Sequence, residues 1–143
     1  MDLEAIVLIQ RLKYRYARAL DTKSWVEFAD TLTVDATAIY GEQLSFDSRD
    51  SFVSFLENTL GSHIITEHQC GQPEIDVDGD TATGIWCLAD TVVIPEDGML
   101  LRGSASITTD TPAAATVNGE SPTRATSGPG NRWWRSPTCR VSD

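Results

Sequence analysis

The sequence predicts a single α+β domain in which helices come first and long antiparallel strands follow. Apolar residues recur at helical spacing in three segments before residue 61 and then in strand-length segments separated by turn residues. The length of 143 residues fits one domain. The net charge of -10, without a basic run, disfavours binding to nucleic acid or to an anionic membrane.

The first helix is predicted from Leu3 to Leu20, with Asp21 at its C-terminal end. Its periodic apolar residues are Leu8, Ile9, Leu12, Tyr16, Ala19 and Leu20. A carboxylate at that end opposes the helix dipole. Asp21 is therefore either a fraying turn residue or an acid held there for a function.

Two shorter helices are predicted next, with one strand between them. Ser24 to Glu27 has the Ser-x-x-Glu form of a capping box and starts the second helix. A strand runs from Ala36 to Tyr40 and ends at Gly41. Asp47 or Ser48 caps the third helix, which stops at Gly61.

The remaining elements are strands joined by turns. The first covers residues 63–70, is interrupted by Pro73 at an edge or a bulge, and resumes over residues 74–77. Asp78-Gly79 predicts a two-residue hairpin turn. The return strand covers residues 81–94, and another strand starts at Met99 after a turn.

The composition changes at about residue 104. Residues 1–103 hold 18 acids and 7 bases, whereas residues 104–143 hold 3 acids and 4 bases. The branched aliphatic residues of this tail are Ile107, Val117 and Val141, and its prolines are Pro112, Pro122, Pro129 and Pro137. We therefore expect the strand from Met99 to stop soon after Gly103, at the latest near Ile107, and the tail to be irregular.

The residues alone leave the functional site open. His63 and His68 are the two histidines, and neither face of their strand is apolar enough to place His68 inside. A lone histidine is more often structural than catalytic. Cys70, Cys87 and Cys139 have no metal or redox spacing and are interpreted as buried free thiols. No metal site is predicted.

Several short motifs resemble the SnoaL-like branch of the nuclear-transport-factor-two-like superfamily. They lie within residues 4–103 and comprise Leu12–Asp21, Trp25, Phe28–Asp30, Asp35–Ala36, Thr66–His68, Pro73–Ala82 and Trp86. Each is degenerate, but their order and spacing are fairly specific for the fold. The resemblance implies a cone-shaped curved sheet wrapped by about three helices around an apolar pocket.

Members of this superfamily include scytalone dehydratase, hexachlorocyclohexane dehydrochlorinase, polyketide cyclases, isomerases and non-catalytic modules. An acid ending helix one pairs with a strand histidine in the first two, and these positions match Asp21 and His68. The resemblance therefore implies a lyase or isomerase without a cofactor, in which His68 is the general base and Asp21 orients it. The residues assigned to binding a small apolar or aromatic molecule are Tyr14, Tyr16, Trp25, Phe28, Tyr40 and Trp86.

The chain departs from these relatives after Gly103. They end with two further strands carrying Gly-x-x-x-Tyr-His and Trp-Arg-Ile, which are absent here. If the possible codons are read from the third base of Ile107, the shifted frame can encode these family motifs in the expected order. Residues 104–143 are therefore interpreted as a frameshifted ending. Residues 1–103 would then be an incomplete domain. The alternatives to an enzyme are a ligand-binding or association module and an inactive, degenerate product.

Self-association and location complete the expectations. The resemblance implies a homodimer or homotrimer formed through the sheet. The chain has no run of 18 apolar residues and no visible signal peptide, which predicts a cytoplasmic protein.

Overall fold

The computed structural model describes residues 2–40, 44–112 and 124–126. Three helices are present, α1 (Leu3–Asp21), α2 (Trp25–Ala29) and α3 (Arg49–Thr59). Strands β1 (Ala38–Tyr40) and β2 (Leu44–Phe46) form a small antiparallel sheet. The main sheet contains β3 (Ile65–Asp78), β4 (Thr81–Ile94), β5 (Met99–Pro112) and β6 (Arg124–Thr126) in that order, all antiparallel. The predicted α+β class is confirmed.

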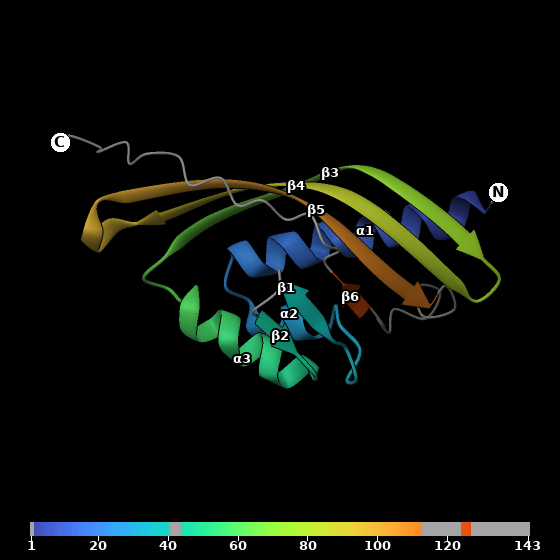
Figure 1. Cartoon of the computed structure of the whole chain (residues 1–143), viewed down its shortest axis with the longest axis horizontal. Coiled ribbons are helices and arrows are strands. Elements are labelled where there is room, and N and C mark those ends of the chain that lie inside the picture. The colour runs from blue at the N-terminus through green and yellow to red at the C-terminus, as the bar shows by residue number, and fades with distance from the viewer. Residues whose placement is uncertain (1, 41–43, 113–123, 127–143) are drawn as a thin grey trace.

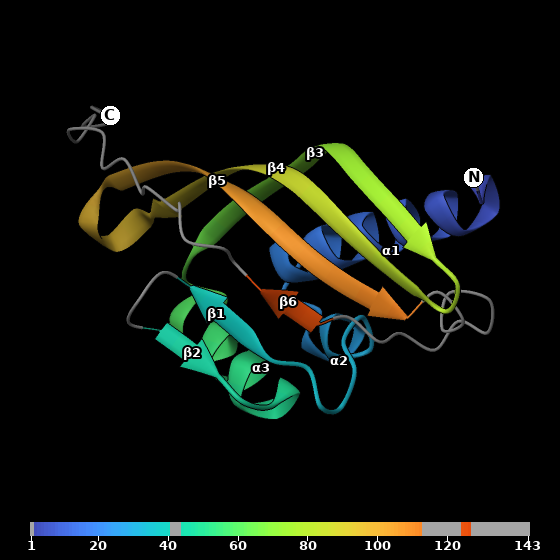
Figure 2. The ribbon, with the colours of Figure 1, turned by 45° about the vertical axis from the view of Figure 1, so that its right-hand side comes forward.

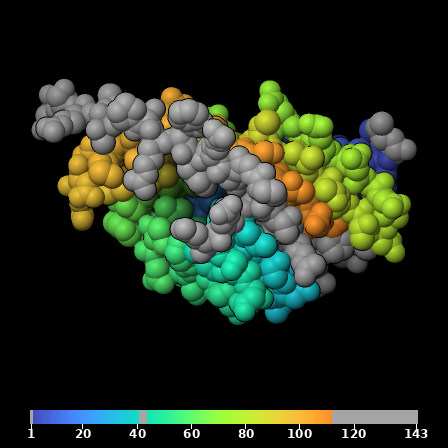
Figure 3. All heavy atoms as spheres, viewed as in Figure 1, coloured from blue at the N-terminus to red at the C-terminus, as the bar shows by residue number. Residues whose placement is uncertain are grey.

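The main sheet is an arch with the helices on its concave side. Strands β3, β4 and β5 curve over α1, and α2, α3 and the β1–β2 sheet lie further below (Figure 1). Turning the molecule shows β6 beside β5 and close to β1 (Figure 2). In the space-filling view, α3 and the β1–β2 sheet form a layer below the strands of the main sheet (Figure 3).

The ends of α1 have local causes. The side chain of Asp2 accepts a hydrogen bond from the backbone of Ala5 at 3.0 Å, which caps the N-terminus. At the other end Lys23 takes the left-handed conformation, with φ 59°, and the backbone N–H of Ser24 bonds the carbonyl of Ala19 at 2.9 Å. This closing pattern usually takes glycine, so Lys23 carries a backbone cost of about 1 kcal/mol.

The capping box predicted for the second helix does not form. Ser24 is the N-cap of α2, but its side chain makes no capping hydrogen bond. Glu27 instead pairs with Arg18 at 2.6 Å and with Arg15 at 3.2 Å, which ties α2 to α1. The Ser48 cap of α3 does form, with the Ser51 backbone donating to it at 3.2 Å.

The turn and the bulge lie where the sequence predicts them. Asp78 pairs with Thr81 across a two-residue turn, and Gly79 has a φ of 56°, which glycine adopts without strain. The register of β3 shifts between Gly71 and Glu74, around Pro73. Because β3 is an edge strand, this bulge interrupts pairing on one side only.

The predicted end of the strand from Met99 is wrong. β5 continues to Pro112, pairs with β4 along its whole length, and pairs with β6 through Thr108 to Asp110. Thr109 and Thr111 are buried and occupy inward positions of β5 where aliphatic residues would be expected. Threonine is a good strand former, so the strand continues through them. Pro112 occupies the last position, where a missing N–H is tolerated. An irregular tail would leave Trp133 and Trp134 exposed or loosely packed on the sheet, but these residues and Cys139 lie outside the described residues.

The core has two parts. The larger cluster joins α1, α2, α3 and β1 through Ala19, Leu20, Phe28, Leu32, Ala36, Ala38 and Phe52. The smaller cluster packs Ile9 of α1 against Ala82 and Trp86 of β4. The smaller cluster holds α1 against the concave face of the main sheet, and the larger one holds α2, α3 and β1 against α1.

Candidate active site

The side chains of Asp21 and His68 are in direct contact. Oδ1 of Asp21 lies 2.6 Å from Nδ1 of His68, and Oδ2 accepts a hydrogen bond from the His68 backbone at 2.8 Å. Packing of α1 against β3 joins these residues, which are 47 positions apart in the chain. The structure thus brings together the acid and the histidine that the resemblance pairs.

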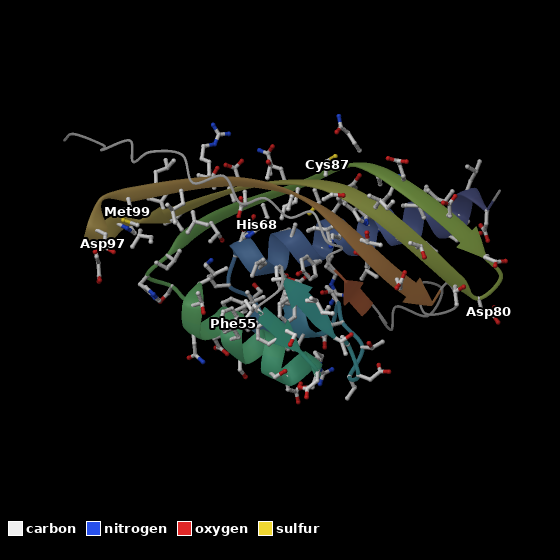
Figure 4. All side chains as sticks on the ribbon, viewed as in Figure 1. Phe55, His68, Asp80, Cys87, Asp97 and Met99 are labelled. Atoms are coloured by element: carbon white, nitrogen blue, oxygen red, sulfur yellow. The ribbon has the colours of Figure 1, made fainter. Side chains whose placement is uncertain are left out.

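This contact determines the tautomer of His68. An ionised carboxylate can only accept hydrogen bonds, so Nδ1 of the neutral ring carries the hydrogen and Nε2 keeps its lone pair. Among the described residues none makes a hydrogen bond to Nε2. His68 lies on the helix side of the sheet, whereas Cys87 lies on the other side (Figure 4). Nε2 is therefore the ring atom that can act as a base.

Two further side chains hold the carboxylate in place. The Thr66 hydroxyl donates to Oδ1 of Asp21 at 2.9 Å, and the Lys23 ammonium donates to that hydroxyl at 2.7 Å. Thr66 is buried on the same face of β3 as His68. These bonds offset the unfavourable position of Asp21 at the C-terminal end of α1.

The same hydrogen bonds change the pKa of Asp21. Partial burial raises the pKa of the carboxyl group, but hydrogen bonds from the His68 side chain and backbone, attraction to His68 and the Thr66 hydroxyl lower it by more. The net pKa lies below the ordinary value, so Asp21 stays ionised at neutral pH.

We expect the free energy of unfolding to show this shift in acid. Because the folded pKa of Asp21 is below the unfolded one, its stabilisation is present above the unfolded pKa of about 3.9 and is lost as the pH falls through the folded pKa. Urea unfolding from pH 5 to pH 2 should therefore show a smaller acid-induced loss for Asp21→Asn than for the wild type. Asp76→Asn, at an exposed position on β3, is the control. Equal losses in both variants would contradict the expectation.

His68 faces an apolar cavity of about 340 Å³. Its walls come from α1, β1, β2, the α3 region and the main sheet: Tyr16, Leu20, Tyr40, Leu44, Phe55, Leu56, Thr59, Leu60, His68, Cys70, Leu88, Asp90, Val92 and Ile107. Figure 4 shows His68 under the main sheet and Phe55 on α3 below it, and both line the cavity. The cavity is large enough for a ligand of one or two rings.

Tyr16 and Tyr40 are the predicted aromatic residues that line the cavity. Burial raises the pKa of both hydroxyl groups, that of Tyr16 well above its usual value. The hydrogen bond between the two hydroxyl groups raises the pKa of Tyr16 further and lowers that of Tyr40, and the nearby Cys70 thiol raises both. Both phenols therefore remain protonated at neutral pH, and Tyr40, which accepts from Tyr16, keeps its own hydrogen for a further hydrogen bond.

The other four predicted binding residues do not line the cavity. Tyr14, on α1, is 51% exposed. Phe28 is fully buried in the larger core cluster, Trp25 packs against that cluster, and Trp86 belongs to the smaller one. Periodicity along a helix or strand predicts which residues face inward. It does not predict whether such a residue packs in the core or lines the cavity. The interpretation of Cys87 as buried also needs correction, because it is exposed.

Most of the cavity wall was not predicted. The contributions from β2 and α3, such as Leu44 and Phe55, depend on how these elements pack under the sheet. The sequence contains one indication that Asp90 faces the cavity: it follows Trp86 and Leu88 at alternate positions of β4, on the inward face of the strand. An acid at an inward position of a strand is the kind of residue that indicates a site.

The structure combines three features: an arched sheet, helices on its concave face, and an apolar cavity between them with an acid–histidine pair at its wall. These features define a class of small α+β proteins with a ligand-sized pocket. The model of the SnoaL-like domain matches residues 1–140, and the chain belongs to this family. The match extends beyond residue 103.

Solved structures support the same fold. A candidate scytalone dehydratase from Novosphingobium aromaticivorans is 17% identical, with a TM-score of 0.78 over 99% of this chain and 91% of that one. A candidate aromatic ring hydroxylase from the same organism is 21% identical, with a TM-score of 0.77 over 88% and 89%. A protein from Catenulispora acidiphila in complex with S-DNPA is 17% identical, with a TM-score of 0.71 over 88% and 95%.

Within residues 2–40, 44–112 and 124–126, no helix is long and apolar enough to cross a membrane. In the same part of the chain, no three His, Cys, Asp or Glu side chains come together as they would around a metal ion.

Proposed function

We propose that the protein binds a small, largely apolar molecule in the cavity and moves a proton on it, as a lyase or isomerase of the dehydratase or cyclase type. The observation that carries the proposal is the contact between Asp21 and His68 at the wall of an apolar cavity. The neighbouring fold that holds S-DNPA supports small-molecule binding.

The chemistry follows from the positions of the groups. Nε2 of His68 removes a proton from a carbon next to an activating group, while Asp21 holds Nδ1–H and stabilises the imidazolium that forms. The Tyr16 hydroxyl donates to that of Tyr40, and the Tyr40 hydroxyl is the donor for an oxygen that gains negative charge. His68 then returns the proton, either to a departing group in a lyase or to another carbon in an isomerase.

Deuterium exchange into an activated ketone tests the proposal without knowledge of the natural substrate. The wild type in D₂O should accelerate exchange at the acidic carbon of 2-tetralone, followed by ¹H NMR. His68→Gln should lower the enzyme-catalysed rate at least ~100-fold, the usual scale for a lost general base.

His63→Gln is the matched control, because His63 is exposed and lies outside the cavity wall. Shifts of cavity resonances on titration of 2-tetralone, without exchange, would indicate the ligand-binding module instead. Exchange that survives His68→Gln would refute the role of the pair.

A further inference from the structure

Asp90 is a half-buried acid that the proposed chemistry does not use. Its side chain lines the cavity that contains His68. Oδ1 of Asp90 is buried and has no hydrogen-bond partner among the described residues. A buried oxygen without a donor is costly to folding, so an unpaired one at a cavity wall calls for an explanation.

The strand register explains why Asp90 has no partner. On β4 it pairs with His68 of β3 on one side and with Gly103 of β5 on the other. Nδ1–H of His68 is already bonded to Asp21 and Nε2 carries no hydrogen in that tautomer, and Gly103 has no side chain. Neither flanking residue therefore supplies a donor to Asp90.

The described part of the cavity wall holds no lysine or arginine that could pair with this acid. The nearby ammonium of Lys13 lies over the ring of Tyr16, 4.4 Å from its centroid, and Lys13 is not part of the wall. An anionic ligand would meet Asp90 without a compensating charge, whereas a hydroxyl group would meet an acceptor.

We infer that Asp90 is the recognition group of the cavity, and that its carboxylate accepts a hydrogen bond from a hydroxyl group of an uncharged, otherwise apolar ligand. Rotation of a carboxylate about its last side-chain bond is easy, so either oxygen can turn to the ligand. The inference rests on the cavity being a ligand site, as proposed above, and names the class of ligand: alcohols, phenols or enols rather than carboxylates or phosphates.

The test compares three probes of one shape, 2-naphthol, 2-methylnaphthalene and 2-naphthoate, by NMR titration of the ¹⁵N-labelled full chain. The informative quantity is the ratio of the Kd values for 2-methylnaphthalene and 2-naphthol, compared between variants. Asp90→Leu keeps the size but removes the acceptor, and should lower this ratio at least tenfold, the scale of a hydrogen bond to a charged group. It should also bind 2-naphthoate more tightly than the wild type does.

Two further variants separate recognition from a structural role. Asp90→Asn keeps a carbonyl acceptor and should retain part of the preference for 2-naphthol, while Asp76→Asn on the exposed face should match the wild type. Asp90→Leu should melt no lower than the wild type, since it removes an unpaired buried oxygen. A ratio unchanged in Asp90→Leu, or the absence of binding of all three probes to the wild type, would overturn the inference.

The experiments distinguish a failure of ligand recognition by Asp90 from a failure of proton transfer by His68. His68→Gln should abolish deuterium exchange but keep the preference for 2-naphthol. If exchange depends on His68 but the Kd ratio does not depend on Asp90, recognition by Asp90 is refuted and the base survives. The reverse pattern keeps the recognition group and removes the base.

Discussion

Replacing Asp21 with asparagine is expected to reduce turnover by about 10² to 10⁴, although the side chain keeps its size and the cavity keeps its shape. The carboxylate accepts from Nδ1 of His68 at 2.6 Å and from the His68 backbone at 2.8 Å. An asparagine amide can turn its NH₂ to the ring and stabilise the tautomer with the hydrogen on Nε2, which is no base.

The measurement is the rate of deuterium exchange for Asp21→Asn, His68→Gln and the double variant. Because the two residues act as one unit, the double variant should be little slower than His68→Gln alone. Losses that multiply would indicate that Asp21 and His68 act separately. Asp30→Asn, an exposed acid at the end of α2, should leave the rate unchanged.

Phe28→Ala is expected to destabilise the fold by about 3–5 kcal/mol, the scale of a buried aromatic residue cut to alanine. Phe28 is fully buried, and its ring centroid lies 4.7 Å from that of Tyr16 and 6.0 Å from that of Phe52. Domains of this size are stable by about 5–15 kcal/mol, so Tm should fall by about 10 °C or more.

Phe55→Ala provides the comparison, since Phe55 is 37% exposed and lines the cavity. It should cost much less in urea unfolding and should weaken binding of 2-naphthol instead. Equal losses of stability for the two variants would show that Phe28 is not the centre of the larger core cluster.

The hypothesis that the chain ends in a frameshifted segment stays a prediction. β5 and β6 show that strand pairing continues beyond Ile107. The frameshift hypothesis concerns the codons rather than the fold, and the coding DNA around codons 100–107 decides it. A shifted frame without Tyr-His and Trp-Arg-Ile segments would contradict the hypothesis.

The sequence by itself determined the elements whose causes are local. The bounds of α1, the Ser48 cap, the Gly79 turn and the bulge at Pro73 follow from periodicity, hydrogen-bonding side chains and backbone preferences within a few residues. The order of these elements was also enough to predict the α+β class. The pairing of Asp21 with His68 came from the family resemblance, because spacing alone left His68 on either face.

The tertiary structure decided what depends on contacts between distant segments. Packing of α1 under the sheet makes one face of β3 the inner face and so puts His68 at the cavity wall. The same packing buries Trp86, leaves Tyr14 exposed and isolates the oxygen of Asp90. β5 extends to Pro112 because β4 offers it a full-length partner, which compensates for a threonine-rich inner face. Burial and pairing of this kind are properties of the assembled layers, and local patterns do not contain them.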